Sequence, residues 1–161
     1  SYCENTLLLK NDLPATQISK FIHDIPTIYA FDTLINNKDR GNHKTNILVA
    51  NESDDYYIFD HERAFKHIGR LSQEINGNTF SETLKSHVLH KYLYRKRNKQ
   101  NLFDTFHEYL RILNIDILDD YNGFLCEHGL DSSEIIQLKS YLRTVKQKSN
   151  WFVSILVSSI S

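Results

Sequence analysis

Oxygen-bearing and charged side chains concentrate in one stretch of this sequence. A polar segment runs from Asn36 to Asn46, and a second apolar run after it ends in Asp60-His61. If the intervening residues form a hairpin, Asp39, Asn46 and Asp60 come toward one end of it. Carboxylate and amide oxygens gathered in this way suit a hard divalent cation such as Mg²⁺.

The same residues supply what phosphoryl transfer requires. That reaction needs a carboxylate near the incoming hydroxyl group, and an Asn and an Asp on metal ions that bridge the phosphates. Asp39 in the loop, followed by Asn46 and Asp60 at the two strands, offers these residue types in order. A transition-metal site of His43, His61, Asp39 and Asp60, as in metal-dependent phosphohydrolases, is an alternative interpretation.

The elements around this segment follow from apolar spacing. Residues 15–23 and 26–36 carry apolar side chains at i, i+3 and i+4, which predicts two short helices, the second beginning at Pro26. Residues 47–50 and 56–59, joined by a polar connection at 51–55, predict a β-hairpin. The helical period returns in 80–95, 102–113, 115–127, 132–148 and 151–160. The sequence therefore predicts one mainly α unit with a small β-hairpin near its start.

Length and composition exclude several classes of protein. The chain has 161 residues, enough for one domain at roughly 100–200 residues per domain. Its 40 % apolar and 12 % aromatic content excludes disordered and disulfide-scaffold classes. The most apolar stretch, 151–160, is too short to span a membrane, so no membrane association is expected. Cys3 and Cys126 lie far apart and no signal-peptide pattern is present, which predicts free thiols and a cytoplasmic location.

The charge balance restricts any polyanion site to a local cluster. A net charge of −1 predicts no general attraction to nucleic acid or anionic membranes. One cluster does interleave aromatic rings with cations, as single-strand nucleic-acid binders do. It consists of Tyr92, Tyr94, Arg95, Lys96, Arg97 and Lys99. Its other interpretations are a solvated helix end and a docking site for a protein or a tRNA-bound substrate. His87 and His90 lack a third metal ligand and are interpreted as surface or half-buried side chains.

Three blocks around the hairpin resemble HipA-like kinases, a branch of the protein kinase-like fold, and especially the small bacterial HipA-like subgroup. The blocks are residues 31–40, 46–49 and 58–61, with Phe65 four residues further on. The resemblance implies ATP and Mg²⁺ as cofactors, Asp39 as the group that orients or deprotonates the acceptor hydroxyl, and Asn46 and Asp60 as Mg²⁺ ligands. It also implies that Arg40 pairs with a carboxylate or phosphate near the loop.

The loop departs from the kinase pattern in its spacing. Kinases place the metal-binding Asn five residues after the catalytic Asp, and Lys44 stands at that position here. Asn46 is the expected ligand because it directly precedes the strand, with Asn42 as the less favoured substitute. Lys44 is grouped with the cofactor-binding residues. Glu62 stands where kinase-like sequences commonly have Gly.

The resemblance implies a kinase-like C-terminal lobe. Residues 1–30 would form lead-in helices, 31–65 the catalytic loop and hairpin, and 66–161 a helical bundle. The first 30 residues hold no phosphate-cradling loop, so the N-terminal ATP-lid lobe is expected to be absent, cut away or supplied by another chain. The implied function is phosphorylation of a Ser/Thr hydroxyl of a protein substrate, in a toxin–antitoxin or signalling context, with an N-terminal lobe or an antitoxin as partner. The alternative is a catalytically silent lobe that binds a protein or nucleic acid.

Overall fold

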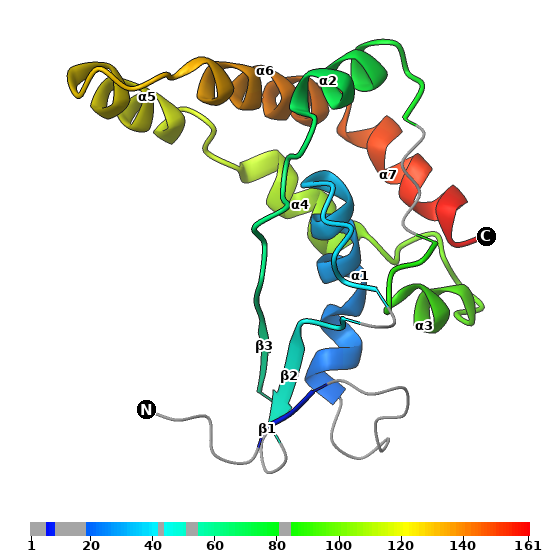
Figure 1. Ribbon diagram of the computed structural model, residues 1–161. Coiled ribbons are helices and arrows are strands. Elements are labelled where there is room, and N and C mark those ends of the chain that lie inside the picture. Colours follow the sequence, from blue (N-terminus) through cyan, green and yellow to red (C-terminus); the bar gives the residue numbers. More distant parts are fainter. Residues whose placement is uncertain (1–5, 9–18, 42–43, 51–54, 81–84) are drawn as a thin grey trace.

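The structure is a computed structural model that describes residues 6–8, 19–41, 44–50, 55–80 and 85–161. Helix α1 runs through the centre, a small sheet lies at one end, and the remaining helices lie toward the other end and along one side (Figure 1). The strands are β1 (Thr6–Leu8), β2 (Ile47–Ala50) and β3 (Tyr56–Ile58). The helices are α1 (Ser19–Leu34), α2 (Ile68–Asn76), α3 (His90–Tyr94), α4 (Asp104–Ile112), α5 (Ile117–Glu127), α6 (Ser133–Gln147) and α7 (Ser149–Ser159). The predicted mainly α fold with a small hairpin is confirmed.

The sheet is antiparallel, with β2 between its two neighbours. Leu48 pairs with Tyr57 of β3, and Val49 pairs with Leu7 of β1. Ile47 and Val49 are buried, as expected for alternate residues that face one core. The hairpin prediction is confirmed, and its connection at 51–54 lies outside the described residues. Strand β1 was not predicted, because its pairing with β2 joins segments about 40 residues apart in the chain.

Helix α1 packs directly on the sheet. The rings of Phe21 and Tyr56 meet edge to face at 5.2 Å between centroids, and the Tyr56 hydroxyl donates to Asp24 Oδ2 at 2.8 Å. Pro26 lies inside this helix, so the prediction of two helices is wrong for residues 19–34, and residues 15–18 lie outside the described part. An internal Pro removes one backbone hydrogen bond. The buried side chains on both sides of it, among them Phe21 and Tyr29, pack into one core and offset that loss.

The end of α1 fixes where the polar loop begins. The N–H of Asn36 donates to the carbonyl of Thr33 at 3.1 Å, and the N–H of Asn37 donates to the carbonyl of Asp32 at 2.8 Å. With a φ of 53° at Asn36, this is the Schellman pattern of helix termination. Asn is one of the few residues other than Gly that adopts this left-handed conformation readily, so Asn36 favours termination of the helix just before it.

Several of the helices after the hairpin contact α1. Helices α4, α5, α6 and α7 confirm four of the predicted segments to within a few residues. The Tyr141 hydroxyl of α6 donates to the carbonyl of Leu34 at 2.8 Å, and the Tyr29 hydroxyl lies 3.1 Å from Ser159 Oγ of α7. Helix α2 was not predicted, and it packs along α6 through the buried side chains of Leu71 and Ile75.

The prediction of one helix over residues 80–95 is wrong. Only α3, five residues long, is helical there, and residues 81–84 lie outside the described part. The N–H of Val88 donates to the carbonyl of Arg40 at 2.9 Å, and Gly41 forms a β-bridge with His87. These bonds hold the backbone of residues 87 and 88 against the polar loop, so it cannot continue a helix.

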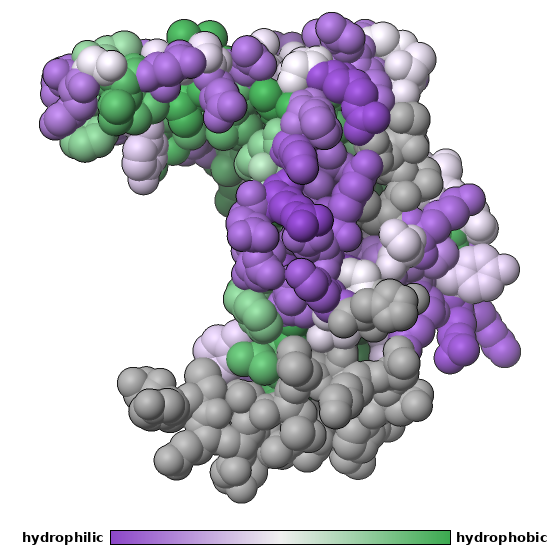
Figure 2. All heavy atoms as spheres, in the orientation of Figure 1, coloured by the Kyte–Doolittle hydropathy of each residue, from purple (hydrophilic) through white to green (hydrophobic). Residues whose placement is uncertain are grey.

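The surface is polar over much of its described area. Figure 2 shows apolar side chains gathered along the arm formed by α5 and α6, and hydrophilic side chains over the middle of the same face. The arm carries the exposed residues Ile117, Tyr121, Phe124 and Ile136. Within the described residues, no helix is both long enough and apolar enough to cross a membrane.

Candidate active site

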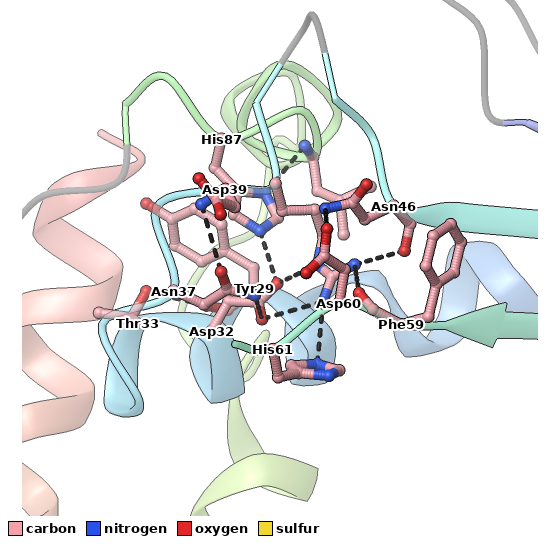
Figure 3. A network of polar contacts seen from close by, with 12 residues as sticks. Tyr29, Asp32, Thr33, Asn37, Asp39, Asn46, Phe59, Asp60, His61 and His87 are labelled. Carbon is pink, nitrogen blue, oxygen red and sulfur yellow. Dashed lines mark hydrogen bonds and ion pairs between the residues drawn. The ribbon is translucent and has the colours of Figure 1, made fainter. Parts of the chain in front are cut away.

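A buried carboxylate holds the polar loop against α1. Asp32 is fully buried in the last turns of α1. Its Oδ2 accepts from Arg40 Nε at 2.6 Å, and its Oδ1 accepts from Asn37 Nδ2 at 3.1 Å (Figure 3). Burial raises the pKa of Asp32, but the hydrogen bonds that it accepts from His87 and Arg40, together with the positive charge of Arg40, outweigh burial and hold that pKa below its ordinary value of 3.8. Asp32 is therefore an anion that pairs with the guanidinium group of Arg40.

His87 completes this buried network as a neutral donor. Its Nε2 lies 2.8 Å from Asp32 Oδ2, and its Nδ1 accepts the backbone N–H of Leu89 at 3.1 Å. Nδ1 acts as the acceptor, so the ring hydrogen sits on Nε2 and is donated to the carboxylate. Burial lowers the pKa of His87 below its ordinary value of 6.5, although Asp32 acts in the opposite direction.

Arg40 joins α1 to both strands of the hairpin. Its side chain is completely buried. Nη1 donates to the carbonyl of Asn46 at 2.6 Å and lies 3.4 Å from the carbonyl of Phe59, while Nη2 donates to His61 Nε2 at 3.0 Å. The N–H of Phe59 also donates to the carbonyl of Asn46 at 3.2 Å. One guanidinium group thus fixes where β2 begins and where β3 ends relative to Asp32.

Asn46 and Asp60 meet at these two fixed points. Asn46 Nδ2 donates to Asp60 Oδ2 at 3.2 Å, with Asn46 buried and Asp60 exposed (Figure 3). Both residues have left-handed backbones, with φ of 48° and 61°, a conformation that Asn and Asp adopt more readily than most residues. An amide and a carboxylate in contact, one of them open to solvent, form a donor set that fits Mg²⁺.

Asp39 lies in the turn that follows α1. Its N–H donates to Asn37 Oδ1 at 3.2 Å, which holds the turn in place. The Asp39 carboxylate forms an ion pair with Arg63, with Nη1 3.0 Å from Oδ1 and Nε 3.0 Å from Oδ2. Arg63 follows Asp60 by three residues, so this pair draws the loop carboxylate toward the chain that leaves β3. The Asp39 side chain is 10 % exposed and that of Arg63 is 55 % exposed.

The other loop residues that were named for a cofactor or a metal site precede Asn46 in the chain. Lys44 is exposed, two residues before Asn46. No group of three or more His, Cys, Asp or Glu side chains within the described residues is arranged to hold a metal ion. Asn42, the less favoured substitute for Asn46, and His43, a member of the alternative transition-metal site, lie outside the described part.

The comparison with family models decides the relationship of this chain to known proteins. A family model described as HipA-like kinase matches residues 11–121. The match covers more than half of the chain and includes α1, the polar loop and the hairpin. The chain belongs to the HipA-like kinase family. As a HipA-like kinase it has a kinase-like function, and kinases in general use ATP and metal ions. No curated protein and no solved structure matches the chain.

Sequence reasoning missed the buried residues that support the site in this HipA-like kinase. Asp32 lies four residues after Ile28 and three after Tyr29, so it shares the core side of α1 with them. A carboxylate at such an apolar position could have identified it from the sequence. The interpretation of His87 as a surface or half-buried side chain is wrong, because His87 is buried against Asp32. Nothing in the sequence indicated this contact, which joins residues 55 positions apart. Arg63 was also missed, since an Arg near a turn is usually solvated.

Proposed function

We propose that this chain catalyses transfer of the γ-phosphoryl group of Mg²⁺-bound ATP to a Ser or Thr hydroxyl group in a protein substrate. The observation that carries the proposal is the contact between Asn46 and Asp60 at 3.2 Å, beside a loop that holds Asp39. Family membership supports the reaction class. The residue types and their order match the needs of phosphoryl transfer, in which positioning and charge stabilisation supply most of the catalysis.

Asn46 and Asp60 would hold Mg²⁺ through amide and carboxylate oxygens. A divalent cation on the phosphates neutralises the negative charge that develops during transfer. The carboxylate of Asp60 supplies the charge for this site, and the amide of Asn46 is a neutral ligand that water can replace. The exposed Lys44 would add a positive charge near the phosphates.

Asp39 would act on the acceptor. Its carboxylate accepts the proton of the substrate hydroxyl while the hydroxyl oxygen forms a bond to the γ-phosphorus and the bond to the leaving oxygen of ADP breaks. The hydrogen bond from the backbone N–H of Asp39 to Asn37 Oδ1 fixes the turn that presents this carboxylate. Arg40 is assigned a positioning role, because its completely buried side chain donates to the protein itself.

We propose that residues 1–161 act as one kinase-like C-terminal lobe, together with an N-terminal lobe carried by preceding sequence or by another chain. The metal-binding residues lie in the hairpin, whereas the phosphate-cradling loop of kinases belongs to the other lobe. An antitoxin protein as a partner and a toxin–antitoxin context rest on the family relationship alone.

The test compares substitutions in the complete two-lobed kinase. Asp60→Asn should abolish transfer and weaken Mg²⁺-dependent nucleotide binding, because an amide cannot replace the charge of the carboxylate. Asp39→Asn should lower the transfer rate by about 10²–10⁴-fold with nucleotide binding nearly intact. Asn46→Ala should resemble Asp60→Asn in a milder form. Asp120→Asn, at an exposed residue of α5, is the matched control. Unchanged transfer in both Asp39→Asn and Asp60→Asn would refute the proposal.

A second candidate function is a catalytically silent lobe that binds a partner. The observation that favours it is the ion pair of Arg63 with both oxygens of Asp39, which occupies the group that would receive the acceptor proton. In this case no phosphoryl group is transferred to protein, whether or not nucleotide and Mg²⁺ bind. The Asp39→Asn variant then equals the parent protein in nucleotide binding and in its lack of transfer.

A further inference from the structure

We propose that the segment 85–103, on the edge of the molecule that carries α3, binds single-stranded nucleic acid. This segment holds six of the chain's 19 Lys and Arg residues and no Asp or Glu. The rest of the chain holds the other Lys and Arg residues of the 19 and all 20 acidic residues, so its net charge is negative. A local cationic surface on an otherwise anionic protein attracts a polyanion at this place and repels it elsewhere. The six cations are Lys85, Lys91, Arg95, Lys96, Arg97 and Lys99.

The charge is presented to solvent by an ordered turn. Arg95, Lys96 and Arg97 are consecutive and exposed, at the point where α3 ends. Figure 2 shows strongly hydrophilic side chains projecting where α3 and the loop after it lie. The N–H of Lys96 donates to the carbonyl of Leu93, and the N–H of Gln100 donates to Asn98 Oδ1. Three adjacent cations on such a turn can each approach a phosphate of a flexible backbone.

An aromatic ring lies among the cations. Tyr94 is 58 % exposed, its ring stacks on His90 at 6.2 Å between centroids, and Lys99 Nζ lies 5.2 Å from the ring centre. Both neighbours are anchored to the end of α7, because His90 Nε2 lies 3.1 Å from the carbonyl of Ser159 and Lys99 Nζ donates to the carbonyl of Ile160. The ring is therefore held in place before a ligand arrives. A ring that is 58 % exposed and lies beside a cation is suited to stacking on an unpaired base.

The composition of the surface favours nucleic acid over an acidic protein. Within residues 85–103, all of which are described, Tyr94 is the only large hydrophobic side chain that is exposed. Protein interfaces usually contain a desolvated apolar centre, which a single ring among cations does not provide. A stacked base needs only one ring face, and its phosphates need only the cations. Stacking requires unpaired bases, so the partner is a single strand of RNA or DNA rather than a duplex.

The test measures fluorescence anisotropy of labelled oligonucleotides of about 12 bases, since single-strand sites span about 4–16 nucleotides. Single-stranded RNA, single-stranded DNA, a DNA duplex and polyglutamate are titrated with the full chain without ATP, between about 50 and 200 mM salt. Binding of RNA or DNA single strands is expected, and the tighter of the two identifies the source. With three exposed cations, log K should fall with log salt with a slope of about −2, at about −0.7 for each phosphate neutralised.

Variants separate charge from stacking. Replacing Arg95, Lys96 and Arg97 by Gln should remove most of the affinity and of the salt slope. The control variant Lys66→Gln/Arg70→Gln/Arg111→Gln removes the same charge elsewhere on the protein and should leave both quantities unchanged. Tyr94→Ala should weaken binding by about tenfold at every salt concentration, and Tyr94→Phe should not. Circular dichroism should show that each variant is folded, because the replaced residues are exposed.

Three results would overturn the proposal. The first is an absence of single-strand binding by the parent chain. The second is tighter binding of the duplex than of either single strand. The third is polyglutamate binding equal to that of the oligonucleotides with no effect of Tyr94→Ala, which would identify a surface for acidic proteins instead.

Discussion

Replacing Asp32 by Asn should destabilise the protein strongly. The carboxylate is completely buried and accepts from Arg40 at 2.6 Å, from His87 at 2.8 Å and from Asn37 at 3.1 Å. The variant leaves the guanidinium group of Arg40 buried without a counter-charge, and it directs an amide N–H₂ at a group that is itself a donor. Breaking a buried ion pair by removing one partner costs about 3–5 kcal/mol. For a chain of 161 residues this lowers the melting temperature by about 6–20 °C.

The measurement is urea and thermal unfolding followed by circular dichroism, after coincident transitions have established two-state behaviour. Asp120→Asn, an exposed carboxylate on α5, is the control and should change the free energy of unfolding by less than about 0.5 kcal/mol. The double variant Asp32→Leu/Arg40→Met removes both charges and should recover part of the stability, because apolar replacement of a whole buried pair is often tolerated.

The double variant also tests whether the network positions the site. It removes the guanidinium bonds to the carbonyls of Asn46 and Phe59. A folded double variant should therefore bind Mg²⁺-nucleotide more weakly in the complete kinase, although neither replaced residue touches the ligand. If Asp32→Asn lowered the free energy of unfolding by less than about 1 kcal/mol, close to the effect of the control, the buried-charge reasoning would be refuted.

Three further outcomes are expected. The free energy of unfolding should decrease as the pH falls through 6.5, because burial lowers the pKa of His87 and the unfolded chain then takes up a proton that the folded protein does not. The contribution is at most about 1.4 kcal/mol per pH unit, and the difference in slope between the parent and His87→Gln in unfolding experiments from pH 7 to 5 measures it. Arg63→Gln should raise the transfer rate of the complete kinase by about two- to fivefold, since it frees Asp39 from a half-exposed ion pair worth at most about 1 kcal/mol; a fall in rate would show that Arg63 is needed for transfer. Titration calorimetry should detect only weak binding of Mg²⁺-ATP by the 161-residue chain alone, and tight binding would contradict the requirement for a second lobe.

The sequence by itself determined the local features of this protein. Two short apolar runs joined by a polar connection predicted β2 and β3, and apolar residues at helical spacing predicted α4 to α7. These signals depend only on residues close together in the chain. The order of Asp39, Asn46 and Asp60 around the hairpin was also readable, and the match of residues 11–121 to HipA-like kinases confirmed the family.

Only the tertiary structure decided what supports those residues. Helix α1 continues through Pro26 because its two halves bury side chains in the same core, and residues 87 and 88 leave the helical pattern because they bond to the loop at Arg40 and Gly41. The buried pairing of Asp32 with His87 joins residues 55 positions apart. Periodicity and motif spacing depend only on residues close together in the chain, whereas a buried charge is paired with residues that are distant in sequence. The network beneath the site could therefore be identified only from the tertiary structure.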